Sequence, residues 1–190
     1  MCGRLIMERI PIAGPSISQR EIGYVTDAAT TGWYDGAGEY PHRFERAFAS
    51  YLEVKHAVSL PSCTSGLHLA LAALGIGPGD EVIVPAMTHV ATAHAVEFVG
   101  AKPIFVDAEP HTGNIDIDQI ENAITPNTKA LSVVHFLGMP VNMDRINEIA
   151  QNHGLFVVED SALAFGTKYK GIHAGLLGDI GLFSMYPVKH

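Results

Sequence analysis

Short apolar segments rich in β-branched residues alternate with segments of helical periodicity from residue 55 onwards. The apolar segments predict strands, and they are residues 57–60, 81–86, 103–107, 130–136, 155–160 and 180–185. Several of them are apolar at nearly every position, which is typical of parallel strands covered by helices on both faces. The pattern therefore predicts a doubly wound α/β fold with a mostly parallel sheet and right-handed crossovers.

Helices are expected where apolar residues recur three and four positions apart. These segments are residues 16–32, 41–52, 64–75, 87–100, 115–124 and 142–154. Ser18 and Glu21 have the spacing of a capping box at the start of the first helix. We interpret residues 10–54, which contain the first two helices, as a helical lead-in to an α/β core at residues 55–190, and not as a separate domain.

The composition narrows the class of protein. Of the 190 residues, 47% are hydrophobic and 17% are charged, which predicts a folded chain with a large core. The formal net charge of −8 argues against a nucleic-acid or anionic-membrane partner. Two cysteines, Cys2 and Cys63, imply no disulfide framework, and no apolar run has the length of a membrane span. We therefore expect a cytoplasmic protein.

Ligands of such sheets bind at the carboxyl ends of the strands, so the polar residues there are the candidates for chemistry. Ser62, Cys63, Thr64 and Ser65 follow the first predicted strand and begin a helix, whose free N–H groups suit a phosphate. A plain helix cap at Ser62 or Thr64 is the alternative. The glycine-rich residues 75–80 precede a strand, so we interpret them as a turn and not as a dinucleotide-binding loop.

Three further residues stand at strand ends or next to them. Asp160 ends the strand at 155–160 and could keep a ring nitrogen protonated, although it could equally cap the next short helix. His89 could stack on a flat ligand, or be an ordinary polar residue at a helix start. His89 and His94 are five residues apart, which does not suit a metal site. Lys189 follows an apolar strand and a proline turn and could be a nucleophile toward carbonyls, whereas most lysines are solvated surface groups.

Taken together, these candidates make up a single set of groups. They are a phosphate cradle, a side chain that stacks on a ring, a carboxylate for a ring nitrogen and an amine for an aldehyde. Pyridoxal 5′-phosphate requires this inventory, with Lys189 forming the Schiff base and Asp160 supporting the electron-withdrawing ring. Their agreement on one ligand is stronger evidence than any one of them.

Longer stretches resemble a known family. GWYDGAGEYPHRFERAFASYL, SCTSGLHLALAALGIGPGDEVIVPAMTHVATAHAV, GAKPIFVD, AITPNTKALSVVHFLGMPVNMD, HGLFVVEDSALAFG and GDIGLFSMYPVKH are similar, in this order, to the DegT-like sugar aminotransferases, which belong to the fold-type I pyridoxal-phosphate enzymes. The resemblance runs from about residue 10 to the end of the chain. It implies that residues 1–190 form the three-layer α/β/α large domain of an aminotransferase, incomplete at its C-terminus and without the small C-terminal domain.

The resemblance also implies roles for single residues. Lys189 matches the lysine that carries the cofactor, Asp160 the partner of the pyridine nitrogen, and His89 the residue stacked on the ring. Phosphate contacts are implied for three more positions, namely Cys63, Thr64 and Ser184.

The sequence departs from the family pattern at one position, and the resemblance leaves alternatives for the activity. Leu163 stands where the family usually has Gln or His near the phenolic oxygen of the cofactor. The expected activity is transamination of a nucleotide-linked keto sugar, with glutamate as the amino donor and a homodimer as the assembly. Sugar dehydration and a non-catalytic, truncated remnant are the alternatives, and we expect little activity from residues 1–190 alone. We also expect a sheet with a vacancy between the strands at 57–60 and 180–185, since the family's next strand would fill it.

Overall fold

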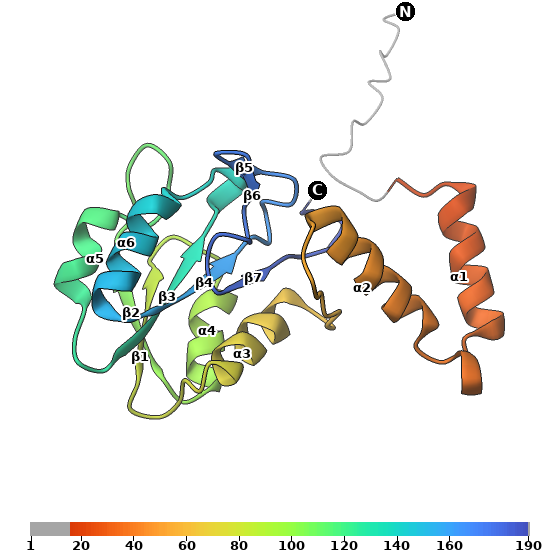
Figure 1. The fold of residues 1–190 in the computed structure, drawn as a ribbon, viewed down its shortest axis with the longest axis horizontal. Helices are drawn as coiled ribbons and strands as arrows, with labels where there is room; N and C mark the ends of the chain where they lie inside the picture. Colours follow the sequence, from red (N-terminus) through yellow and green to blue (C-terminus); the bar gives the residue numbers. More distant parts are fainter. Residues whose placement is uncertain (1–15, 190) are drawn as a thin grey trace, which may run out of the picture.

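A parallel sheet forms the centre of the computed structural model, which describes residues 16–189 (Figure 1). Within these residues, five strands pair in the order β2-β1-β3-β4-β7, and every neighbouring pair is parallel. The strands are β1 (Glu81–Pro85), β2 (Lys102–Val106), β3 (Thr128–Val134), β4 (Phe156–Asp160) and β7 (Ile180–Leu182). The predicted α/β fold with a mostly parallel sheet is thus confirmed. A short antiparallel hairpin of β5 (Lys168–Tyr169) and β6 (Ile172–His173) lies before β7.

Helices cover both faces of the sheet, which makes three layers (Figure 1). One layer contains α3 (Cys63–Ala73) and α4 (Ala91–Phe98), and the other contains α5 (Ile117–Ala123) and α6 (Met143–His153). The strands pack against both helical layers, because successive side chains of a strand point to opposite faces of the sheet. In β1, Val82 and Val84 pack with α3 and α4, whereas Ile83 packs against α5 and α6. Each such fully buried side chain contributes roughly 1.5–3 kcal/mol to folding.

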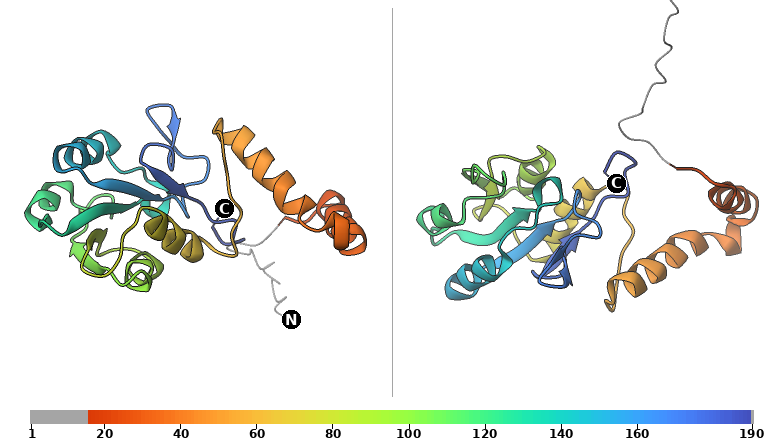
Figure 2. Two further views of the ribbon diagram at one scale, coloured as in Figure 1. Left: turned by 60° about the horizontal axis from the view of Figure 1, so that its bottom comes forward. Right: turned by 90° about the horizontal axis from the view of Figure 1, so that it is seen from above.

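The two N-terminal helices lie to one side of this three-layered body (Figure 2). They are α1 (Gln19–Thr31) and α2 (Glu39–Leu52), with a 3₁₀ turn at Tyr34–Gly36 between them. The capping box of Ser18 and Glu21 is present as predicted. Every residue of α1 is at least partly exposed, whereas α2 reaches the body through aromatic contacts. Residues 10–15 of the predicted lead-in lie outside the described residues.

Residues 57–60 correct the sequence-based strand assignment. Their exposure alternates as in a strand, with Val58 at 70% and Leu60 at 40%. Within the described part of the chain, however, they pair with no other strand, and Ser59 instead donates its N–H to Glu45 Oε1 at 2.8 Å. The β-branched composition favours an extended backbone, but a strand also needs a neighbour. The strand prediction is therefore wrong for these residues. The expected vacancy agrees with the structure, because within the described residues β7 is an edge strand and no strand pairs with residues 57–60.

Other predicted boundaries shift by a few residues. The strand predicted at 130–136 ends at Val134, because a 3₁₀ turn (Phe136–Gly138) follows His135. The strand predicted at 180–185 ends at Leu182. Residues 75–80 form the predicted turn, which is closed where Asp80 Oδ2 accepts the Gly77 N–H at 3.0 Å. Among residues 16–189, the helices are too short or too polar to cross a membrane.

Candidate functional site

An open cavity of about 1170 Å³ lies between the sheet body and the segment that joins α2 to α3. Its wall is built from the start of α3, the loops that follow β1 and β4, and the chain after β7. The structure brings all six predicted site residues to this wall, namely Cys63, Thr64, His89, Asp160, Ser184 and Lys189. Residues separated by more than a hundred positions along the chain therefore share one site.

The start of α3 offers backbone donors to the cavity. Ser62 is the N-cap, and its hydroxyl accepts the Ser65 N–H at 3.1 Å, so the capping role that the sequence left open belongs to Ser62. The N–H groups of Cys63 and Thr64 precede the first hydrogen bond within the helix and have no acceptor inside it. Unpaired N–H groups and the positive end of a helix dipole favour an anion, and here both face the cavity wall.

Asp160 presents a buried carboxylate at the carboxyl end of β4, with 5% of the residue exposed. Its Oδ1 accepts the Ala162 N–H at 3.1 Å, and its Oδ2 accepts the Thr92 hydroxyl at 3.2 Å. Burial raises the pKa of Asp160, and these two hydrogen bonds offset the rise only in part. A carboxylate has about four acceptor positions, so this one can still accept from a ligand.

The thiol of Cys63 lies beside this carboxylate, with Sγ 3.9 Å from Asp160 Oδ1. Burial, followed by the negative charge of Asp160, raises the pKa of Cys63 to about 12, and the positive charge of Lys189 opposes the rise. The thiol is therefore neutral at physiological pH and can act as a weak hydrogen-bond donor.

Lys189 and Ser184 come from the segment that follows β7. A turn forms there, in which Lys189 donates its N–H to the Tyr186 carbonyl at 2.9 Å. The Tyr186 N–H in turn lies 3.3 Å from Ser184 Oγ. The positive charge of Lys189 opposes the rise that burial causes in the pKa values of Asp160 and Cys63. The amine thus acts electrostatically on the same groups that the sequence grouped with it.

His89 lies in the loop between β1 and α4 and lines the cavity. Its Nδ1 accepts the Ala91 N–H at 3.2 Å, so the other ring nitrogen, Nε2, carries the proton when the ring is neutral. This bond orients an exposed imidazole ring at the cavity wall.

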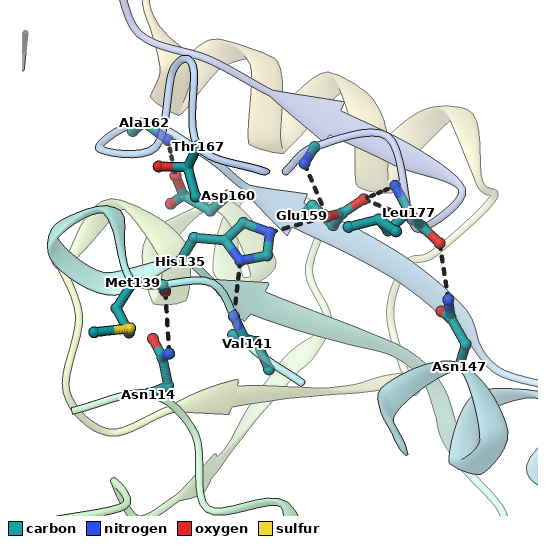
Figure 3. Close-up of polar contacts among 12 residues, drawn as sticks. Asn114, His135, Met139, Val141, Asn147, Glu159, Asp160, Ala162, Thr167 and Leu177 are labelled. Atoms are coloured by element: carbon teal, nitrogen blue, oxygen red, sulfur yellow. Dashed lines mark hydrogen bonds and ion pairs between the residues drawn. The ribbon is translucent and has the colours of Figure 1, made fainter. Parts of the chain in front are cut away.

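A second carboxylate, Glu159, holds the protein part of the site together and was not recognised from the sequence. Its side chain and that of His135 are fully buried, with His135 Nε2 2.9 Å from Glu159 Oε2 (Figure 3). His135 Nδ1 accepts the Val141 N–H at 3.1 Å, so Nε2 carries the hydrogen that is donated to Glu159.

Glu159 also ties down the loop that leads into β7. It accepts the backbone N–H groups of Gly175, Leu177 and Gly178 at 2.9, 2.6 and 2.5 Å (Figure 3). The fit around this loop is close, because a Cβ on Gly181 would lie 1.7 Å from the Gly175 carbonyl oxygen. Since β7 continues into Ser184 and Lys189, Glu159 fixes the strand that delivers both of them.

Two other positions complete the comparison with the sequence. Thr92 contacts Asp160 and was also missed. Thr88 and Thr92 are four positions apart in the helix predicted at residues 87–100, a spacing that could have signalled a shared polar face. Leu163, which departs from the family pattern, lies half-buried in the turn after Asp160. It is not among the residues that line the cavity in the described part of the chain.

Known proteins resemble this chain over nearly its whole length. Residues 15–190 match the model of the DegT/DnrJ/EryC1/StrS aminotransferase family. GDP-perosamine synthase of Caulobacter vibrioides is 46% identical over 183 residues, which are 96% of this chain and 49% of that protein. Spore coat polysaccharide biosynthesis protein SpsC of Bacillus subtilis is 46% identical over 181 residues, which are 95% of this chain and 46% of that protein.

Solved structures agree with these matches. The PLP-form of the putative sugar aminotransferase Spr1654 from Streptococcus pneumoniae is 35% identical, with a TM-score of 0.90 over 95% of this chain and 50% of that one. The chain spans about half the length of the curated relatives it matches. The sequence, the three-layered fold and these matches together show that the chain belongs to the DegT/DnrJ/EryC1/StrS aminotransferase family.

Proposed function

We propose that this chain is the cofactor-binding part of a pyridoxal-phosphate-dependent aminotransferase that transfers an amino group to a nucleotide-linked keto sugar. The observation that carries the proposal is the meeting of the six predicted residues at one cavity, at the carboxyl edge of a parallel sheet. Relatives named as GDP-perosamine synthases and a neighbour described in PLP- and PMP-forms support the same reading.

The groups around the cavity fit this cofactor. The N–H groups of Cys63 and Thr64 stand at a helix start, where a phosphate is favoured. Asp160 is an acceptor with unused lone pairs, which suits a protonated ring nitrogen. Lys189 brings an amine to the same cavity, and His89 brings a flat ring.

In this assignment Lys189 acts twice. Its Nζ would hold the cofactor covalently, and the same amine would serve as the base and acid that moves a proton at the substrate carbon. When bound, pyridoxal phosphate supplies an aldehyde for amines and a ring that withdraws electrons from the bonds being broken. Asp160 would keep the ring nitrogen protonated, Ser184 would add a hydroxyl to the phosphate site, and His89 would stack on the ring.

The remaining partners are part of the same proposal. The amino donor is an amino acid, with glutamate the first to test, and the sugar is linked to a nucleotide, with GDP-linked sugars the first to assay. We also propose that the protein acts in the cytoplasm as a homodimer and binds neither nucleic acid nor membranes. Transamination is favoured over sugar dehydration because Lys189, and not histidine, stands at the position that carries the cofactor.

Trapping of the cofactor on the protein tests the proposal. The longest polypeptide that the gene encodes is incubated with pyridoxal phosphate, reduced with borohydride and mapped by mass spectrometry. We expect the label on Lys189, a visible absorption band that Lys189→Ala abolishes, and an unchanged band in the control Lys170→Ala, whose amine pairs with Asp144 on the surface. A band that survives Lys189→Ala would refute the assignment of this lysine.

Assays with keto sugars then separate the reaction types. Net transfer of the amine to the sugar supports the proposal, and loss of a sugar hydroxyl without amine transfer supports dehydration. Cofactor binding with neither reaction across a panel of sugars and donors would support a non-catalytic protein.

A further inference from the structure

The carboxylate of Asp160 is held at both of its oxygens by different parts of the fold. Ala162, two residues further along the chain, donates its N–H to Oδ1 at 3.1 Å. Thr92, on the first turn of α4, donates its hydroxyl to Oδ2 at 3.2 Å. Because the two donors approach opposite ends of the group, together they define the plane of the carboxylate.

The hydroxyl of Thr92 can play only one role in this arrangement. An ionised carboxylate accepts hydrogen bonds and donates none, so the hydrogen of Thr92 Oγ1 points to Asp160. Thr88 Oγ1 lies 2.9 Å from Thr92 Oγ1, and it must then donate its own hydrogen to Thr92. The hydroxyls of Thr88, in the loop before α4, and of Thr92, in its first turn, thus form a directed series of hydrogen bonds that ends on Asp160.

Burial makes the hydrogen bond from Thr92 to Asp160 costly to lose. Thr92 is 1% exposed, so its hydroxyl has no water to replace a lost partner. In the described part of the chain, Thr92 is not among the residues that line the cavity. It can therefore affect a ligand there only through Asp160.

We propose that Thr92, oriented by Thr88, is a positioning residue that sets the plane of the Asp160 carboxylate and stabilises its anionic form for a cationic ring nitrogen. This inference rests on the proposed function, because it needs a cofactor with such a nitrogen in the cavity. It adds a residue that the family resemblance did not bring to attention.

The electrostatic surroundings of Asp160 make the role measurable. Other groups also act on its charge: Lys189 after β7, Cys63 on α3 and His135 after β3. Burial raises the pKa of Asp160, and the Thr92 hydroxyl works against that rise. Without the hydroxyl the carboxylate holds its proton to a higher pH, so affinity for the cofactor should begin to fall at a higher pH as the solution is acidified.

The test compares Thr92→Val, which keeps the shape and removes the hydroxyl, with Thr92→Ser, which keeps the hydroxyl and removes a methyl group. Pyridoxal phosphate is titrated into each full-length protein by absorbance from pH 6 to 9, with thermal unfolding followed in parallel. We expect roughly tenfold weaker binding for Thr92→Val, which is the size of one hydrogen bond to a charged group, and a midpoint shifted to higher pH. Thr92→Ser should stay close to the wild-type protein in both respects.

Several outcomes would overturn the inference. Equal affinity and equal pH midpoints for Thr92→Val and wild type would do so, and so would equal losses for the valine and serine variants, which would indicate packing of the methyl group. If Thr92→Val does not fold, Thr88→Val carries the test. It should shift binding in the same direction by a smaller factor, and an unchanged titration would count against the proposal. A wild-type protein that binds no cofactor would instead refute the proposed function.

Discussion

Glu159 and Asp160 are neighbours at the end of β4, yet their side chains point to opposite faces of the sheet and meet opposite surroundings (Figure 3). Glu159 accepts hydrogen bonds from His135 and from three backbone N–H groups of the loop before β7. Asp160 accepts one backbone N–H, one hydroxyl and a weak bond from the Cys63 thiol, and it faces the cavity with the rest of its capacity.

The difference appears in the proton affinities of the two carboxylates. Burial raises the pKa of both groups. For Glu159, hydrogen bonds from His135, Gly178 and Gly175 more than offset burial, and its pKa is lowered from 4.5. For Asp160, the available donors do not offset burial, and its pKa is raised from 3.8. A carboxylate whose acceptor positions are filled by donors of the protein stabilises the fold, whereas one with unused acceptor positions is available to a ligand.

The largest effect on stability is expected from Glu159→Gln. The amide would place its own N–H groups against two of the four donors, so we expect a loss of about 3 kcal/mol in the free energy of unfolding. Urea unfolding at pH 7 measures it, with Glu148→Gln as the control, because Glu148 forms an exposed pair with Arg145 on the surface of α6. Equal stability of the Glu159 variant and wild type would contradict the structural role of this network.

Asp160→Asn should act in the opposite direction on stability. The amide removes a poorly compensated buried charge, so we expect a gain of roughly 1 kcal/mol at pH 7 together with a severe loss of cofactor binding. A variant that is less stable than wild type would show that Asp160 also has a structural role.

The pH dependence of stability sharpens the contrast. Glu159, with its lowered pKa, contributes stability that is present above its unfolded value of 4.5 and is lost as pH falls through its folded value. Asp160, with its raised pKa, has a destabilising effect that is present above its folded value and disappears below its unfolded value of 3.8. Urea unfolding from pH 7 to 3 should therefore show a flatter acid loss for Glu159→Gln than for wild type, and a shrinking advantage for Asp160→Asn.

The smallest expected effect concerns Cys63, whose thiol reports the charge of Asp160. A pKa of about 12 leaves very little thiolate at pH 8, so alkylation by iodoacetamide should be slow at this position. Asp160→Asn removes one of the causes that raise this pKa, and a severalfold faster alkylation is expected. Peptide mapping quantifies the reaction at Cys63, and an unchanged rate would show that the charge of Asp160 does not reach the thiol.

The fold was predictable to the extent that local patterns decide it. Strands β1, β3 and β4 are apolar runs in the sequence, and they are covered on both faces, as such runs require. Residues 57–60 have the same local character but form no strand within the described chain, because pairing depends on a neighbour that local sequence does not specify.

The candidate site was predictable where chemistry and strand ends coincide. Asp160, Lys189 and His89 stand out as polar residues at such ends, and the family resemblance ordered them into one site. Glu159 and Thr92 carry no such signal. A glutamate at the end of a strand and a threonine in a helix are ordinary until the fold shows what they touch.

The sequence by itself determined the alternation of strands and helices and the residue types available at the carboxyl edge of the sheet, because periodicity and strand ends are local properties. Only the tertiary structure decided that Glu159 is saturated while Asp160 remains available. That difference arises from donors on His135, on the loop before β7 and on α4, which are distant in sequence and meet the two carboxylates only when β3, β4 and β7 pair.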